Sequence, residues 1–241
     1  MQRILRAAAG CGGLIACLAL LSGHARAALP TQTLEQKIAA HQPASPHMSG
    51  TVALPVKAQR YWESWERARR AATGNAQLAV LIAPARAMNG LQQAAYVQAA
   101  VHRRIRWISD ATEWGRHDYW ASASETLARG AGDMEDRAIL KMEALKNLGV
   151  PSRDLFLTMG RDRVAGPVTV LIARMDGRYL MFDDSDAPPK PVEMRPDFEP
   201  ILTLGHGASW LHGKRRAPEL IAAKAVAPRP APRGASSGSQ R

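Results

Sequence analysis

The sequence is poor in cysteine and lacks histidine over its middle. Its two cysteines, Cys11 and Cys17, both lie near the N-terminus. The rest of the chain therefore offers no disulfide, no thiol ligand and no thiol nucleophile. No histidine lies between His117 and His206, so that stretch supplies no imidazole base. The scattered histidines are expected to be surface or structural residues: His102, His117, His206 and His212.

Residues 1–27 have the pattern of a secretory signal peptide. A start with two arginines precedes an almost wholly apolar run over 7–22, and Ala25-Arg26-Ala27 forms a small-x-small cleavage site. The apolar run is short for a membrane span, which favours cleavage and no stable membrane insertion afterwards. Lipidation at Cys17 is the alternative. The prediction is a protein secreted through the inner membrane, with the periplasm as its destination.

The formal net charge of +11 is carried mainly by the two ends of the chain. Residues 1–27 hold three arginines and no acid, and the segment from Lys214 onward holds seven Lys/Arg against Glu219. Residues 28–213 contain 22 Lys/Arg against 20 Asp/Glu, so the body of the protein is nearly neutral. This balance argues against a nucleic-acid-binding surface.

The order of the elements predicts an α+β fold. Apolar residues recur at helical spacing in the first half, whereas β-branched runs and an Asp176-Gly177 turn signal follow in the second. The helices are expected at 61–72, 91–109, 122–130 and 134–148, and the strands at 155–159, 168–174 and 178–182. Residues 78–82 fit either type, and 110–121 is expected to be a loop. Helices followed by antiparallel strands are typical of an α+β domain.

Composition divides the chain into four segments, with no internal repeat. After the signal peptide, residues 28–58 are rich in Pro, Ala, Gln and Ser and are expected to be a loosely ordered lead-in with one short helix at 34–41. Residues 59–213 form the predicted domain. Residues 214–241 are rich in Ala, Pro, Arg and Ser, and we expect a disordered basic tail there.

The stretch from Gly130 to Ile139 is the most informative part of the sequence. Asp133 has the side chain of a helix N-cap, and the following Glu135 and Asp136 complement the positive end of the helix dipole. Met134 then takes the first helical position. A cysteine at such a position would be activated, because the helix start stabilises a thiolate. Methionine offers only an inert thioether.

Several short motifs surround this stretch. They are Val101–Trp107, Asp110, Trp114-Gly115, Asp118-Tyr119-Trp120-Ala121, Glu125, Leu127, Gly130, Gly132-Asp133, Glu135-Asp136, Leu148–Pro151, Pro200-Ile201-Leu202 and Trp210-Leu211-His212. Together they resemble the bacterial transglutaminase-like cysteine peptidases, the family of the periplasmic LapG proteases. The resemblance covers about residues 90–213. It implies a papain-like, transglutaminase-like core.

The family's chemistry requires a cysteine at a helix start, a histidine on a facing strand and an acid after the next strand. The resemblance places the cysteine position at Met134 and the histidine position at Pro167 or Val168. The acid position is retained, most plausibly as Asp183. Because loss of one such member removes most of the rate, a cysteine mechanism is excluded.

The resemblance also implies a Ca²⁺ site, because LapG-type members are calcium-dependent through this acidic stretch. The ligands would be Asp133, Glu135 and Asp136, with Asp118 as a further contributor from the preceding loop. Helix capping without a metal explains the same acids equally well. Among the aromatic residues, Tyr119 and Trp120 are expected in the core, and Trp114 is a candidate for partner binding.

Three functions are compatible with these features. The first is a non-catalytic binding or regulatory protein, linked by resemblance to surface-adhesin and biofilm control, with an adhesin-type substrate or an inner-membrane receptor as its partner. The second is an active hydrolase with an unrecognised nucleophile, for which Ser122, Ser124 and Thr169 are the candidates. The third is a structural envelope protein that keeps only the fold.

Overall fold

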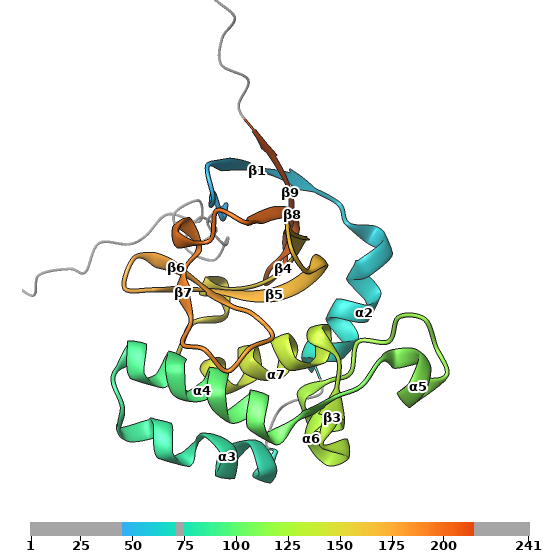
Figure 1. Cartoon of the computed structure of the whole chain (residues 1–241), viewed down its shortest axis with the longest axis vertical. Helices are drawn as coiled ribbons and strands as arrows, with labels where there is room; N and C mark the ends of the chain where they lie inside the picture. Colours follow the sequence, from blue (N-terminus) through green and yellow to red (C-terminus); the bar gives the residue numbers. More distant parts are fainter. Residues whose placement is uncertain (1–44, 71–74, 215–241) are drawn as a thin grey trace, which may run out of the picture.

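The computed structural model describes residues 45–70 and 75–214, in which a layer of helices packs against one face of an antiparallel sheet (Figure 1). The predicted α+β class is confirmed. The helices are α2 (Gln59–Arg70), α3 (Ala76–Ile82), α4 (Gly90–Arg104), α5 (Asp110–Trp114), α6 (Ala123–Arg129) and α7 (Met134–Asn147). None of the helices in these two ranges has the length and apolar character needed to cross a bilayer.

The main sheet has seven strands in the order β1-β9-β8-β4-β5-β6-β7, and every neighbouring pair is antiparallel. Its strands are β1 (Thr51–Val56), β4 (Leu155–Asp162), β5 (Gly166–Met175), β6 (Arg178–Phe182), β7 (Lys190–Pro191), β8 (Phe198–Leu204) and β9 (Ser209–Lys214). A separate two-stranded parallel ladder joins β2 (Arg106–Trp107) to β3 (Ala131–Gly132). The predicted hairpin turn at Asp176-Gly177 connects β5 to β6, where both residues have positive φ.

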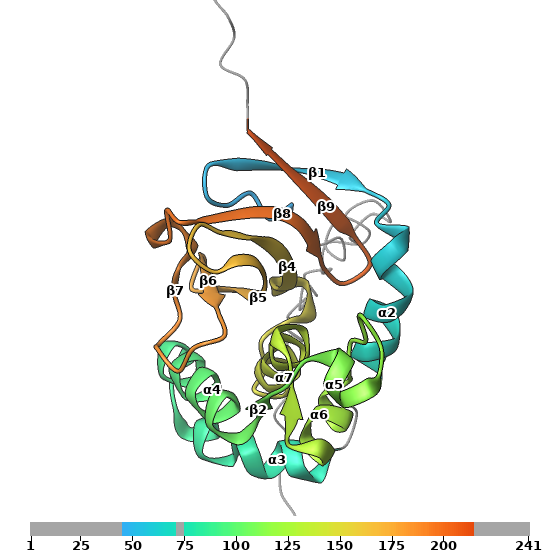
Figure 2. The same ribbon diagram turned by 45° about the vertical axis from the view of Figure 1, so that its right-hand side comes forward.

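Helix α7 lies centrally between the sheet and the other helices (Figure 2). Ten of its residues are buried, including Ile139, Leu140 and Leu145. The inner cluster around α7 also takes in Leu171 of β5 and Val101 of α4. Alternate residues of β5 point to the opposite face of the sheet, where a second cluster forms. Strand β5 therefore has one face toward α7 and one face away from it.

Two boundaries predicted from the sequence are wrong. The helix expected over 91–109 ends at Arg104, because the Arg106 backbone N–H donates to the Gly130 carbonyl oxygen and starts the β2–β3 ladder. The expected loop over 110–121 contains α5, since Ser109 starts a new helical turn by accepting from the backbone N–H groups of Thr112 and Glu113.

The lead-in over 28–58 was expected to be loosely ordered, but part of it belongs to the sheet. Residues Thr51–Val56 form β1, which pairs with β9 along its full length. The composition of this segment gives no local signal for a strand. The strand forms by pairing with β9, which lies over 150 residues later in the chain. The expected helix at 34–41 and the tail beyond Lys214 lie outside the described residues.

A line of hydrogen-bonded side chains crosses four strands of the main sheet, beginning at β1. His212 Nδ1 lies 2.7 Å from Thr51 Oγ1, and His212 Nε2 lies 2.8 Å from Thr203 Oγ1. Thr203 Oγ1 in turn lies 2.9 Å from Thr158 Oγ1. Burial and the nearby His47 lower the pKa of His212 to about 4. The neutral imidazole thus links β1, β9, β8 and β4.

We predict that His212 makes the fold acid-sensitive. In the unfolded chain the pKa of His212 lies near 6.5. Between about pH 6.5 and pH 4 the unfolded state therefore binds a proton that the folded state does not. Lowering the pH through this range reduces the free energy of unfolding. Urea denaturation at pH 7 and pH 5 should show a smaller loss of stability for His212→Gln than for the wild type. The exposed His206→Gln is the control, and equal losses in all three proteins would contradict the assignment.

Candidate functional site

The predicted helix cap at the start of α7 is present. Asp133 has extended backbone angles, and its Oδ1 accepts from the backbone N–H groups of Glu135 and Asp136 at 3.2 and 3.4 Å. Met134 is the first residue of α7. Its sulfur accepts the backbone N–H of Thr169 at 3.2 Å, which ties the helix start to β5. The position that would carry a nucleophile is therefore filled by a thioether in contact with the sheet.

Strand parity determines which β5 side chain faces Met134. Thr169 lies on the face toward α7, and its Oγ1 donates to Glu135 Oε1 at 2.7 Å. Val168 packs instead against the second cluster, on the opposite face of the sheet. Pro167 shares the parity of Thr169 but is exposed. Of the two positions predicted for the missing histidine, only Pro167 is on the face of β5 that points toward α7. The β5 residue that contacts Met134 is neither of these two but Thr169.

A hollow with a volume of about 590 Å³ opens at the start of α7. We call it the α7 hollow. Its lining combines acids from α5, the loop after α5 and the start of α7 with aliphatic, thioether and aromatic side chains. It is lined by Tyr61, Asp110, His117, Asp118, Trp120, Asp133, Met134, Glu135, Met159, Gly160, Pro167, Val168, Thr169, Ile201, Leu202 and Leu211.

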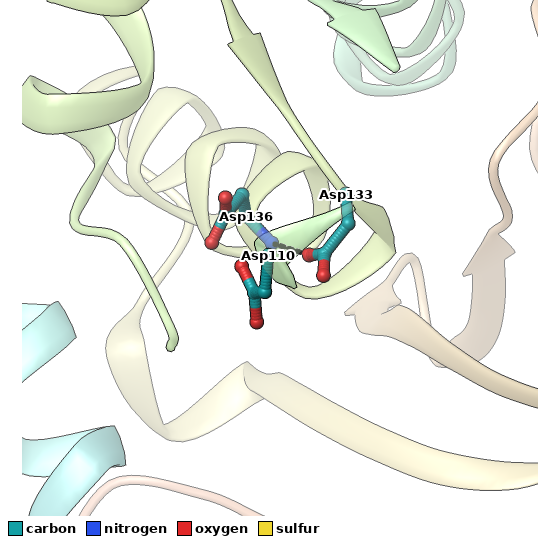
Figure 3. A group of neighbouring side chains, drawn as sticks. All are labelled: Asp110, Asp133 and Asp136. Carbon is teal, nitrogen blue, oxygen red and sulfur yellow. Dashed lines mark hydrogen bonds between the residues drawn. The ribbon is translucent and has the colours of Figure 1, made fainter. Parts of the chain in front are cut away.

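Three carboxylates meet at the start of α7 (Figure 3), and two of the residues, Asp110 and Asp133, line this hollow. Asp110, Asp133 and Asp136 each offer an oxygen, and these oxygens lie within 4.8 Å of one another. Of the other predicted ligands, Glu135 bonds to Thr169 and Asp118 lies exposed at the edge of the hollow. The structure thus keeps two of the predicted acids in the cluster and adds Asp110.

Asp110 and Asp136 are each held by one backbone donor from the loop that follows α5. Asp110 Oδ2 accepts from the Tyr119 N–H at 2.6 Å, and Asp136 Oδ1 accepts from the Ala121 N–H at 2.7 Å. The second carboxylate oxygen of each aspartate is buried and has no hydrogen-bond partner within the described residues. Buried polar atoms are normally paired, so these two oxygens have capacity left for a ligand.

Burial and mutual repulsion shift the pKa values of the cluster upward. Burial, reinforced by the charges of Glu135, Asp136 and Asp110, raises the pKa of Asp133 to about 9. Burial raises the pKa of Asp136 to about 7, and it also raises the pKa values of Asp110 and Glu135. These shifts mean that the protein alone favours protons at this site, whereas a divalent cation would favour the ionised carboxylates.

The retained acid Asp183 does not line the hollow. Its carboxylate accepts from Gln98 Nε2 at 3.1 Å, Ser185 Oγ at 2.6 Å and Arg195 at 2.8 Å. Burial acts to raise the pKa of Asp183, but the Ser185 hydrogen bonds and the Arg195 pair lower it overall. Lys141 Nζ also donates to the Asp183 carbonyl oxygen. This residue therefore anchors the end of β6 to α4 and α7.

The two candidate serines lie outside the hollow, at the start of α6. Ser122 caps that helix, and its buried hydroxyl donates to Glu125. Ser124 Oγ accepts from Asn75. Only Thr169 among the three predicted substitute nucleophiles lines the hollow.

The aromatic residues of the 114–120 segment form a stack with arginines. The Trp114 and Tyr119 rings lie 4.3 Å apart between their centroids. Arg129 covers Trp114 at 3.8 Å and Arg67 covers Tyr119 at 4.2 Å. Trp120 is buried, as expected, whereas Tyr119 is half-buried. Trp114 lies in this stack rather than in the hollow, and its role in partner binding stays a prediction.

Residues 58–193 match the family model of the bacterial transglutaminase-like cysteine proteinases, which covers more than half of the chain. The chain belongs to this family. The fold described above is thus the fold of one member of this family. In this member a methionine stands at the start of the central helix.

Solved structures with similarity to the chain include Legionella pneumophila LapG in a calcium-bound form, with 23% identity, a TM-score of 0.49, and coverage of 66% of this chain and 91% of that one. The EGTA-treated form of LapG has 21% identity, a TM-score of 0.47 and the same coverage. A cysteine protease described as putative, from Cytophaga hutchinsonii, has 14% identity and a TM-score of 0.38, covering 64% and 51% of the two chains. No curated protein matches the chain significantly.

In the sequence Asp110 stands out only as part of a motif, and it was not predicted as a metal ligand. The available signal was its position shortly before Asp118-Tyr119, in a family motif rich in acids. Its distance from Asp133 in sequence hid the contact, because the β2–β3 ladder brings the two segments together. The apolar lining from β8 and β9, Ile201 and Leu211, was missed for the same reason.

We predict that Gly132→Ala damages the cluster. A Cβ at position 132 would lie 2.7 Å from Asp136 Cβ and 2.8 Å from its Oδ2, so Asp136 or the start of α7 must move. Overpacking of this kind costs about 1–3 kcal/mol. Urea denaturation should show that loss for Gly132→Ala, whereas Gly213→Ala has no atom within 4 Å and serves as the control. Equal stability of the two variants would contradict the close packing.

Proposed function

We propose that this chain is a secreted, periplasmic member of the cysteine proteinase family that has lost catalysis and acts by binding. The observation that carries this proposal is Met134, which occupies the helix start and whose sulfur accepts the Thr169 N–H. A thioether has no ionisable proton and cannot attack an amide carbonyl as a thiolate does. The hollow remains open beside it.

The base that the family mechanism needs is missing as well. Neither Pro167 nor Val168 can accept a proton, and Asp183 is engaged away from the hollow. His117 lines the hollow but is exposed, and none of the hydrogen bonds within the described residues joins it to Met134 or Thr169. Without an imidazole next to the attacking group, no residue both activates it and protonates the leaving amine.

One contact favours a second function, a hydrolase with a hydroxyl nucleophile. Thr169 Oγ1 donates to Glu135 Oε1 at 2.7 Å, so a hydroxyl in the hollow does lie within reach of a carboxylate base. Burial raises the pKa of that carboxyl, which brings it closer to a working base. The arrangement still lacks a group that donates a proton to the leaving amine, and we therefore rank it second.

The acid cluster supports calcium as the ligand of the binding protein. Calcium takes oxygen ligands at 2.3–2.6 Å, so two ligands on opposite sides of one ion lie about 5 Å apart. The oxygens of Asp110, Asp133 and Asp136 satisfy this limit, and two of the residues carry unpartnered buried oxygens within the described part of the chain. Bound calcium would offset the repulsion that raises the pKa values of these acids.

The resemblance to the LapG proteases suggests two kinds of partner. The chain could hold a large surface adhesin without cutting it, or it could occupy the inner-membrane receptor that captures an active relative. Either role would link it to biofilm control. Both need the fold and an open hollow, and neither needs a nucleophile.

We predict that calcium stabilises the protein through this cluster. A ligand that binds only the native state at a hundredfold excess over its Kd adds about 2.7 kcal/mol to the free energy of unfolding. The melting temperature should therefore rise between EGTA and millimolar calcium in the wild type, and should not change in Asp110→Asn/Asp136→Asn. Asp118→Asn, outside the cluster, is the matched control and should respond like the wild type. An unchanged wild-type melting temperature would refute the calcium site and leave helix capping as the role of the acids.

A further inference from the structure

The lining of the α7 hollow has two chemically different parts: an acidic wall from α5, the loop after α5 and α7, and an apolar wall from β8 and β9. Asp110, Asp118 and Glu135 line it on the acidic side. Leu211 and Ile201 line it on the apolar side and remain 46% exposed each, which is high for aliphatic side chains. A ligand that fits both walls is an extended peptide in which apolar side chains flank a positive charge.

The apolar wall continues along the sheet beyond the hollow. Leu211 of β9 pairs in register with Leu54 of β1, and Leu54 is 53% exposed. Directly paired residues of antiparallel strands lie on the same face. Leu54 and Leu211 thus extend the apolar lining into a strip on β9 and β1, and we call this the β9 strip.

The chain itself contains a segment with the required chemistry. Residues 219–226 read Glu-Leu-Ile-Ala-Ala-Lys-Ala-Val, in which Lys224 is flanked on both sides by apolar residues. The whole segment from Lys214 onward carries seven Lys/Arg against the single acid Glu219. A positive charge next to the acidic wall favours the ionised form of its carboxyl groups, so Lys224 and these acids are complementary.

The segment also starts in the right place. It follows β9 directly, and Leu211 lies only three residues before the end of that strand at Lys214. Leu220 follows Lys214 by six residues, a length of chain that can reach at most about 20 Å. A return along three strand residues to the level of Leu211 needs about 10 Å. The length of chain is therefore sufficient for residues 219–226 to fold back over the β9 strip.

We propose that residues 219–226 occupy the α7 hollow and the β9 strip of the same molecule, with Lys224 toward the acidic wall and Leu220 on Leu211. The hollow is then covered by the chain's own C-terminal segment, and an external partner must displace it. This inference goes beyond the proposed function, because it requires neither bound calcium nor the loss of catalysis.

The test uses the full chain and a fluorescein-labelled peptide of residues 217–228, followed by fluorescence anisotropy. A tethered segment competes at an effective concentration in the millimolar range, so the wild type should bind the peptide weakly. The full-chain variant Leu220→Asp/Lys224→Glu, whose own segment no longer fits, should bind it at least tenfold more tightly. Arg229→Glu/Ala231→Asp makes the same charge change further along the chain and should behave like the wild type.

A second pair of variants locates the binding surface. Leu211→Asp, added to Leu220→Asp/Lys224→Glu, should abolish peptide binding, whereas Leu91→Asp at an exposed site on α4 should not. Equal peptide affinity of wild type, control and released variant would overturn the proposal. It would also be overturned by no binding to the released variant, or by binding that survives Leu211→Asp.

Sedimentation velocity distinguishes docking within one molecule from docking between two copies. The wild type should sediment as a monomer at two concentrations, since the segment reaches the β9 strip of its own chain. A dimer that dissociates in Leu220→Asp/Lys224→Glu would mean that the segment docks on a second copy, and it would overturn the proposal.

Running the peptide titrations in calcium and in EGTA keeps this inference separate from the proposed function. Because Asp110 belongs both to the acidic wall and to the calcium cluster, bound calcium would compete with Lys224 and weaken peptide binding. Peptide binding that is the same in both buffers therefore leaves the docked segment standing and counts only against the calcium site. Cleavage of the peptide by the wild type would count only against the loss of catalysis.

Discussion

Three aspartate carboxylates are held together at the start of α7, and much of the surrounding structure compensates their repulsion. Asp133 is stabilised by the free N–H groups of the helix, while Asp110 and Asp136 each take one N–H from the loop after α5. The β2–β3 ladder fixes the two segments that carry them. Because the cluster is buried, even this support leaves the pKa of Asp133 at about 9, and a cation is the natural further stabiliser.

Two of the positions that the family resemblance marks as catalytic, Met134 and Asp183, have structural contacts of their own. The Asp183 carboxylate accepts hydrogen bonds from Arg195, Ser185 and Gln98, which joins the end of β6 to α4. Met134 likewise ties α7 to β5 through the Thr169 N–H. Met134 and Asp183 thus each hold neighbouring elements of the fold together. With methionine at its start, α7 still packs against the sheet, and the α7 hollow still opens beside it.

Local sequence signals predicted the features that depend on neighbouring residues. The cap at Asp133, the capping box at Ser122 and the Asp176-Gly177 hairpin all follow from side chains within four positions of one another. Features that depend on distant pairing were not predicted. Strand β1 has no local signal because its partner β9 lies far along the chain, and Asp110 joins Asp133 only once β2 and β3 pair.

The central claim is that the α7 hollow binds without cutting, and peptide hydrolysis by the purified wild type tests it most directly. Alanine-rich and adhesin-derived peptides are incubated with wild type and with Thr169→Ala, in calcium and in EGTA, and new termini are sought by mass spectrometry. The account predicts no new termini from the wild type under either condition. Cleavage by the wild type that disappears in Thr169→Ala would contradict it and would establish the Thr169 hydroxyl as the nucleophile.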